Sequence, residues 1–235
     1  MIKKAVIKVS LLVILAIVSS IVIYNYFDKN KTNEISITED EKKFKNEYES
    51  LNGKKNASGK EYSNVEIVED NGIVYASYSE IKKVITEGTG VIYFGYPECP
   101  WCRNAVPMLL QAASNTGLDK IYYFNAKEMR DTKELDVNGN VVTTKEGTKE
   151  YYELVELLSS VLGEYEGLND ESIKRLYFPT VVFIKNGVIV GCHIDTLPSQ
   201  TDPRVPLNEE QKGELVNIYT NNITKISDDV CDDKC

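Results

Sequence analysis

Residues 91–102 read VIYFGYPECPWC, an apolar run followed after four residues by two cysteines spaced as C-x-x-C. The apolar run 91–94 predicts a buried strand, and residues 102–113 predict a helix. Residues 121–124, IYYF, predict the next strand. A strand, a helix and a strand at this spacing are typical of a βαβ unit with parallel strands. The cysteine pair therefore lies where a buried strand passes into a helix.

A thiol at the start of a helix is held where a negative charge is stabilised. The first backbone N–H groups of a helix are unpaired, and its dipole is positive there, so the thiolate form is favoured. Thiolate is the attacking species in disulfide exchange, and the spacing lets the sulfur of Cys102 reach back to that of Cys99. C-x-x-C is also half of many zinc sites, but no second C-x-x-C or Cys/His pair completes one. We expect a redox pair and no metal.

Two stretches together resemble the thioredoxin superfamily. Residues 99–103, CPWCR, with Pro107 eight residues after Cys99, resemble the active-site helix of that family and its kinking proline. Residues 178–187, FPTVVFIKNG, resemble its cis-proline strand and the turn that follows. The resemblance covers about residues 75–226. The members most similar in style are extracytoplasmic, membrane-tethered thiol oxidoreductases, including bacteriocin-transport accessory proteins.

The resemblance implies a fold and a set of roles. The fold is an α/β thioredoxin-like three-layer α/β/α arrangement with a central mixed sheet and an insertion after the second core strand, at about residues 130–170. Cys99 is then the nucleophile and Cys102 the resolving thiol. Pro179 is expected to be cis and, with the backbone of Phe178, to receive an extended substrate peptide. Trp101 is expected to offer substrate an apolar contact surface, and no cofactor is implied.

The chain departs from the family beside the cysteines. Cytosolic thioredoxins carry a buried acid in the strand before the motif, where this sequence has Tyr93. We expect Tyr93 to pack in the core, with a hydroxyl near Cys102 as the alternative. Glu98 precedes Cys99, and a carboxylate there is expected to raise the pKa of that thiol. These changes leave the direction of electron flow open.

The N-terminus predicts a membrane anchor. Residues 9–27 carry no charge, and 19 residues at about 1.5 Å each span about 28 Å, close to the hydrocarbon thickness of a bilayer. Lys3, Lys4 and Lys8 precede the run, so the N-terminus is expected in the cytoplasm and the remainder outside. A cleaved signal peptide is the alternative, but no convincing cleavage site follows the run. The predicted location is a single-pass protein of the cell membrane.

The rest of the chain divides by composition into three further parts. Residues 28–62 are expected to form a tether with a short amphipathic helix that begins with a capping box at Thr38. Residues 63–228 are expected to form the thioredoxin-like domain, and residues 229–235 a tail. In that tail Cys231 and Cys235 are expected to form a local disulfide, and a mobile pair that exchanges with the active site is the alternative. Cys192 is expected to be a small buried apolar residue.

Charge and histidine content exclude other functions. The chain has 27 Lys and Arg against 36 Asp and Glu, a net charge of −9, which disfavours binding to nucleic acid. His193 is the only histidine, which excludes catalysis built on several, and we expect it to be a packed or surface residue rather than a catalytic base. The sequence thus predicts an extracytoplasmic thiol–disulfide oxidoreductase acting on thiols or disulfides of exported proteins or peptides, with a redox partner in the membrane. The alternatives are a non-catalytic peptide-binding or folding-assistance module, for example in peptide export, and a stalk-mounted structural protein.

Overall fold

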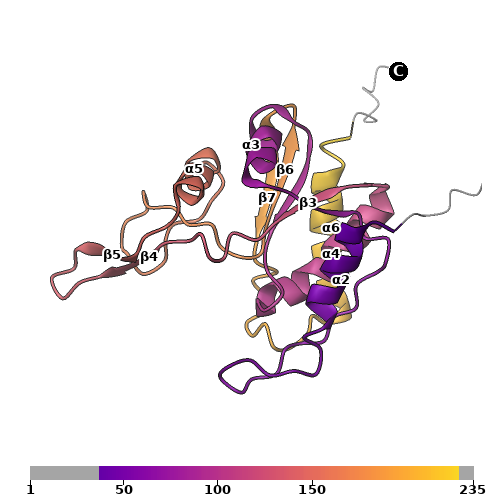
Figure 1. The fold of residues 1–235 in the computed structure, drawn as a ribbon, viewed down its shortest axis with the longest axis horizontal. Helices are drawn as coiled ribbons and strands as arrows, with labels where there is room; N and C mark the ends of the chain where they lie inside the picture. Colours follow the sequence, from indigo (N-terminus) through magenta and orange to yellow (C-terminus); the bar gives the residue numbers. More distant parts are fainter. Residues whose placement is uncertain (1–36, 228–235) are drawn as a thin grey trace, which may run out of the picture. The chain divides into compact units, whose positions relative to one another are not determined.

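Short apolar runs form a central mixed sheet. The structure is a computed structural model that describes residues 37–227, and its five-stranded sheet has the order β1-β3-β2-β6-β7 (Figure 1). The strands of this sheet are β1 (Ile73–Tyr75), β2 (Gly90–Phe94), β3 (Ile121–Phe124), β6 (Thr180–Lys185) and β7 (Val188–Ile194). A separate hairpin comprises β4 (Thr132–Leu135) and β5 (Val141–Lys145). The helices are α2 (Glu39–Glu49), α3 (Tyr78–Glu87), α4 (Pro100–Thr116), α5 (Lys149–Leu157) and α6 (Glu209–Ile223).

Strand register places the end of β2 beside the start of β6. β1 and β2 both pair in parallel with β3, as the expected βαβ unit requires. β6 pairs in antiparallel with both β2 and β7. In the β2–β6 pair, Phe94 lies opposite Thr180. The loop that leads from β2 to the cysteines therefore lies next to the residues that precede Thr180.

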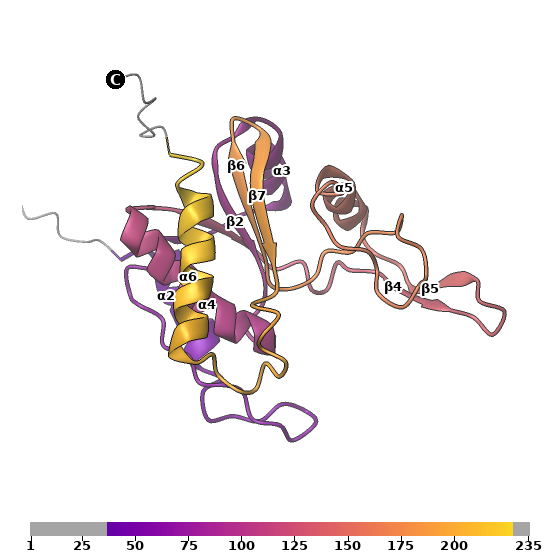
Figure 2. The ribbon, with the colours of Figure 1, turned by 180° about the vertical axis from the view of Figure 1, so that it is seen from behind.

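Helices cover both faces of the sheet. Helices α2, α4 and α6 gather together on one face, while α3 lies on the other, where it contacts α5 (Figure 2). All five residues of β2 are buried, as expected for the central strand of a sheet covered on both sides. This mixed sheet between helix layers fits the thioredoxin-like fold expected from the sequence.

Helix α2 is part of the domain rather than of a tether. Its capping box at Thr38 forms as expected. Phe44 and Tyr48 are completely buried, and the ring of Phe44 meets that of Tyr123 edge-on at 5.0 Å. The compact unit begins at Ile37, so the boundary expected at residue 63 is wrong. The apolar face of this short amphipathic helix therefore supplies part of the core.

The insertion follows β3, which is the third strand of the sheet in chain order because β1 also belongs to the sheet. The expected position, after the second strand, is therefore wrong. Its hairpin turns at Asn138–Gly139, a residue pair typical of tight hairpin turns, and extends beside the sheet (Figure 1). The helix after the hairpin, α5, buries Leu154 in the core, and Leu158, which caps the end of the helix, is buried there too. The insertion therefore contributes both a protruding hairpin and a covering helix.

The expected anchor, residues 1–27, and the tail cysteines Cys231 and Cys235 lie outside the described residues. Within residues 37–227, none of the helices has the length and apolarity that crossing a bilayer requires.

A buried guanidinium joins the N-terminal segment to the active-site helix. Arg103 is 2% exposed. Its Nη1 donates to the carbonyls of Tyr48 at 2.9 Å and Pro97 at 3.1 Å. Its Nε donates to the carbonyl of Ser63 at 2.6 Å, and Nη2 donates to Oδ1 of Asn52 at 2.7 Å. One side chain next to Cys102 in sequence thus fixes the end of α2, the loop after it and the loop before the cysteines.

We expect Arg103→Met to destabilise the protein by about 3 kcal/mol, because buried carbonyls lose a charged donor and are left unpaired. Urea unfolding followed by the fluorescence of Trp101, the only tryptophan, measures this loss. Arg204→Met, at a half-exposed arginine, is the control and should change stability by less than about 0.5 kcal/mol. Equal stability of the two variants would contradict the role assigned to Arg103.

Candidate active site

Cys99 is the N-cap of α4. Pro100 occupies the first turn, where its missing N–H costs nothing. The Sγ of Cys99 accepts a hydrogen bond from the backbone N–H of Cys102 at 3.3 Å. Only 4% of Cys99 is exposed. The sulfur therefore takes the position that a capping oxygen takes in other helices.

The pKa of Cys99 is lowered. The main cause is a hydrogen bond from the side chain of Cys102, and the backbone N–H groups of Cys102 and Trp101 act in the same direction. Burial of the thiol opposes them, and so does the negative charge of Asp195. Hydrogen-bond donors at the helix start thus outweigh burial and favour the thiolate.

The pKa of Cys102 shifts the opposite way. This residue is completely buried, and burial raises its pKa well above the ordinary value. Its hydrogen bond to Cys99 and the charge of that sulfur raise it further, whereas a hydrogen bond with the side chain of Tyr93 lowers it. The pair thus combines a thiolate-prone outer sulfur with a protonated inner one, the division that a nucleophile and a resolving thiol require.

The expected cis-proline lies against Cys99. The Phe178–Pro179 peptide bond is cis, as the sequence predicted. The thiol of Cys99 donates to the carbonyl of Phe178 at 3.5 Å, although the two residues are 79 positions apart in the chain. The carbonyl of Pro179 accepts from the N–H of Asp195 at 2.8 Å. The structure therefore brings Cys99, Cys102, Phe178 and Pro179 together.

Aromatic and basic side chains surround this point. The rings of Tyr96 and Phe178 meet edge-on at 5.5 Å. Arg130 lies over the ring of Phe178 at 4.5 Å, and Lys127 lies over that of Tyr96 at 4.8 Å. Trp101 is half-buried on the first turn of α4. Tyr96, Lys127 and Arg130 were not expected at the site, and the one signal that the sequence offers for the two cations is their position just after β3.

Asp195, rather than Glu98, is the carboxylate that acts on Cys99. Glu98 is paired with Lys127 at 3.8 Å, which offsets its charge. Asp195 follows β7 with a φ of 64°, in the left-handed region that aspartate tolerates better than most residues. Partial burial and the nearby charge of Glu166 raise its own pKa. Among the main influences on the pKa of Cys99 the carboxylate is thus Asp195, while Glu98, which was expected to act there, is half-exposed and lies beside Lys127.

The remaining candidates behave as packing residues. Cys192 is half-buried against the core, and burial raises its pKa to about 12, so it stays a thiol at neutral pH. The Nε2 of His193 lies 2.6 Å from the carbonyl of Thr196 and must carry the proton, because a carbonyl only accepts. The pKa of His193 is lowered by burial. Tyr93 is completely buried in the core, as expected, and its side chain also lowers the pKa of Cys102.

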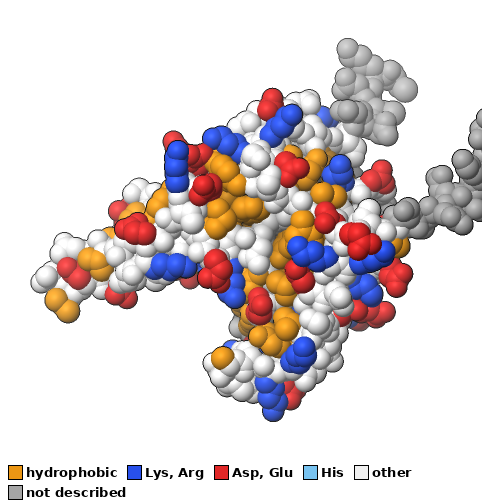
Figure 3. Space-filling model, viewed as in Figure 1, with side chains coloured by type: hydrophobic (Ala, Val, Ile, Leu, Met, Phe, Trp, Pro, Cys, Tyr) orange, Lys and Arg blue, Asp and Glu red, His pale blue; other side chains and the backbone are white. Residues whose placement is uncertain are grey.

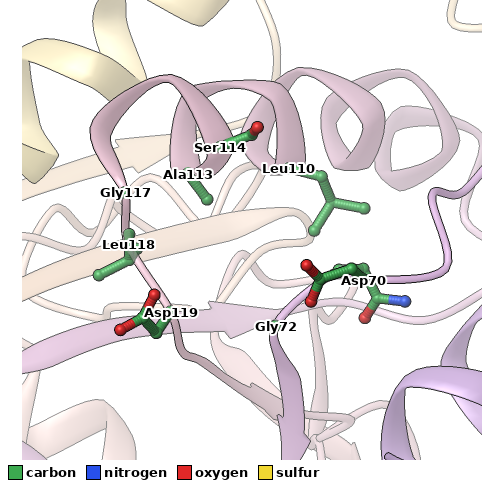
Figure 4. Close-up of a pocket in the computed structure, with 9 residues that line it drawn as sticks. Asp70, Gly72, Leu110, Ala113, Ser114, Gly117, Leu118 and Asp119 are labelled. Atoms are coloured by element: carbon green, nitrogen blue, oxygen red, sulfur yellow. The ribbon is translucent and has the colours of Figure 1, made fainter. Parts of the chain in front are cut away.

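A separate hollow lies at the far end of α4. Its lining residues come from α4 and the turn after it and from the segment before β1: Leu110, Ala113, Ser114, Gly117, Leu118 and Asp119, with Asp70, Asn71 and Gly72 (Figure 4). At about 1.5 Å per residue it begins more than 10 Å along the helix from Cys102. This hollow therefore does not belong to the cysteine site. On the face drawn in Figure 3, acidic and basic side chains are interspersed rather than gathered by sign.

Comparisons with known proteins leave the family open. No family model matches the chain, and no curated protein matches it. Among solved structures, the chain is similar to the crystal structure of thioredoxin O2 from Arabidopsis thaliana in the oxidized state. The two are 16% identical, with a TM-score of 0.34 over 63% of this chain and 96% of the other. The fold assignment rests on the sheet order and register described above.

We expect Asp195→Asn to move the pH profile of Cys99 alkylation to lower pH. Loss of a negative charge removes a contribution that raises the pKa of Cys99, so more thiolate is present at a given pH. The rate of iodoacetamide modification, read by mass spectrometry of the peptide that contains Cys99, measures the shift. Glu98→Gln is the matched control and should leave the profile in place. A shift in the control and none in Asp195→Asn would restore Glu98 as the relevant carboxylate.

Proposed function

We propose that the chain is a thiol–disulfide oxidoreductase that uses Cys99 and Cys102. The observation that supports this most directly is the opposite shift of the two thiols at the start of α4: the pKa of Cys99 is lowered and that of Cys102 is raised. A structural disulfide needs no such difference, whereas a two-step exchange does. The carbonyl of Phe178 beside Cys99 marks where a substrate backbone would pass.

The proposed reaction is a pair of thiolate exchanges. The thiolate of Cys99 attacks one sulfur of a substrate disulfide, forms a mixed disulfide and releases the other substrate sulfur as a thiolate. Cys102 then loses its proton and attacks the sulfur of Cys99, and the second substrate sulfur leaves and takes up a proton. The protein ends with a Cys99–Cys102 disulfide and the substrate with two thiols. The reverse sequence oxidises a substrate, and the reaction uses only the two sulfur atoms as electron carriers.

The proposed substrate is an extended segment of an exported protein or peptide. The aromatic pair Tyr96 and Phe178 offers apolar contact, and Trp101 adds to it on the first turn of α4. Lys127 and Arg130 above these rings would favour a carboxylate near the reacting cysteine of the substrate. The edge of this surface comes from the chain that leads into the insertion.

The proposed location is the outer side of a cell membrane. Support comes from the uncharged run 9–27 and the three lysines before it. Each turnover leaves the pair oxidised or reduced, so a second protein must reset it. A membrane redox partner fits a catalytic domain that is anchored beside the bilayer.

We expect Cys99→Ser to abolish reduction of a peptide disulfide and Cys102→Ser to accumulate a mixed disulfide through Cys99. The reason is that only the outer sulfur can attack substrate, while the inner one releases it. Turnover and the mass of trapped adducts measure both effects, with Cys192→Ser as the matched control that keeps activity. Peptide binding that survives Cys99→Ser in a chain that never turns over would indicate a binding module instead.

We expect the reduction potential of the Cys99–Cys102 pair to lie above about −270 mV, the value for thioredoxin. Stabilising the thiolate of Cys99 favours the reduced form and makes the disulfide more oxidising. Equilibration of the detergent-solubilised chain with glutathione, followed by mass spectrometry, measures it. A value well below about −300 mV with slow exchange would mean that the pair is a structural staple.

A further inference from the structure

Two tyrosine hydroxyls meet beneath the cysteine pair. The Oη atoms of Tyr48 and Tyr93 are 2.7 Å apart, and both residues are completely buried. Tyr93 belongs to the central strand β2, and Tyr48 comes from α2, which precedes the first strand of the sheet. The contact therefore joins a helix outside the βαβ unit to the strand that leads to the active site.

Tyr93 also acts on the inner thiol. An interaction of its side chain with that of Cys102 lowers the pKa of the thiol, so Tyr48, Tyr93 and Cys102 form a chain of interacting groups. Gly95 makes this arrangement possible. A Cβ on Gly95 would lie 2.1 Å from the Tyr93 Oη, so any larger residue would displace the hydroxyl.

The surroundings keep this chain neutral. Burial raises the pKa of Tyr48 and of Tyr93 well above the ordinary value, and the charge of Cys102 adds to both shifts. Among residues 37–227, the buried carboxylates are Glu41 and Asp131. Glu41 accepts from the N–H of Gly72, and Asp131 pairs with Lys133, so both are engaged elsewhere. Among the main influences on the pKa of Cys102 there is the side chain of Tyr93 and no carboxylate.

We propose that Tyr93 is a catalytic residue of the resolving step, donating a hydrogen bond to the Cys102 thiolate, and that Tyr48 is the positioning residue that orients its hydroxyl. This inference rests on the proposed function. When Cys102 attacks the mixed disulfide, its proton is given up, the Cys102–Cys99 bond forms and the bond from Cys99 to substrate breaks. The departing substrate sulfur takes the electron pair and a proton. While Cys102 is negative, Tyr93 can only donate to it, and Tyr48 can then donate to Tyr93.

The arrangement has a consequence for the N-terminal helix. A hydroxyl that receives a hydrogen bond is a better donor, because hydrogen bonds in a chain polarise one another. Tyr48 supplies that bond, and its own backbone carbonyl is fixed by Arg103 of α4. Helix α2 thus acts on the chemistry at Cys102 through one buried contact as well as on stability.

The test separates the two thiols with Ellman's reagent. In a full-length chain whose Cys192, Cys231 and Cys235 are replaced by Ser, the first release of thionitrobenzoate reports attack by Cys99. The second release reports resolution by Cys102. For Tyr93→Phe we expect the second phase to slow about 10-fold and its pH profile to move up by about one unit, since one pKa unit is a tenfold change in thiolate at a given pH. The first phase should change less than about twofold.

Two further variants and one control test whether the effect comes from the Tyr93 hydroxyl. Tyr48→Phe should slow the second phase in the same direction by a smaller factor, and Gly95→Ala should resemble Tyr93→Phe because it displaces the same hydroxyl. The matched control is Tyr123→Phe, since the ring of Tyr123 stacks on that of Tyr93 at 5.6 Å and its buried hydroxyl has no hydrogen-bond partner among the described residues. This control should leave the second phase and its pH profile unchanged.

The outcomes are distinct. An unchanged second-phase pH profile in Tyr93→Phe, with two phases in the parent chain, overturns the role of the tyrosines and leaves the proposed function standing. Equal shifts in Tyr93→Phe and Tyr123→Phe also overturn it, because packing alone would then explain both. A parent chain that releases only one equivalent overturns the proposed function together with this inference.

Discussion

The pairing of β2 with β6 is the constraint on which the site depends. It places Phe94 opposite Thr180, so the loop to Cys99 and the residues Phe178 and Pro179 end on the same edge of the sheet. The hydrogen bond between the Cys99 thiol and the Phe178 carbonyl follows from that register. A slip of one residue would turn every side chain of β2 to the other face and would remove Tyr93 from Cys102.

The N-terminus of α4 gives its two cysteines opposite pKa shifts. Cys99 caps the helix and collects donors from the first turn, whereas Cys102 lies one turn inside, where burial is complete. Hydrogen-bond donors lower the pKa of each thiol and burial raises it. The net shift differs between the two thiols because only Cys99 lies where backbone N–H groups are unpaired. The division between an attacking and a resolving sulfur is therefore a product of position along the helix. Tyr93 then limits how far burial disfavours the inner thiolate.

Sequence reasoning succeeded where the deciding interaction is local and failed where it is distant. The cysteine motif, the capping box at Thr38, the Asn-Gly turn and the cis-proline each lie within a few residues and carry their own signal. Asp195, Tyr48 and Arg103 act across 40 to 96 positions, and nothing in their neighbours marks them. Glu98 is the converse case, because it is adjacent to Cys99 in sequence and yet forms an ion pair with Lys127.

The packing of α2 also changes what the proposed anchor can do. A tether through residue 62 would have let the catalytic domain range far from the bilayer. The compact unit begins at Ile37, and the uncharged run ends at Phe27, so nine residues separate them. If residues 9–27 anchor the chain as proposed, so short a lead would favour substrate segments that come close to the membrane, and it would favour repeated encounters with a redox partner embedded there.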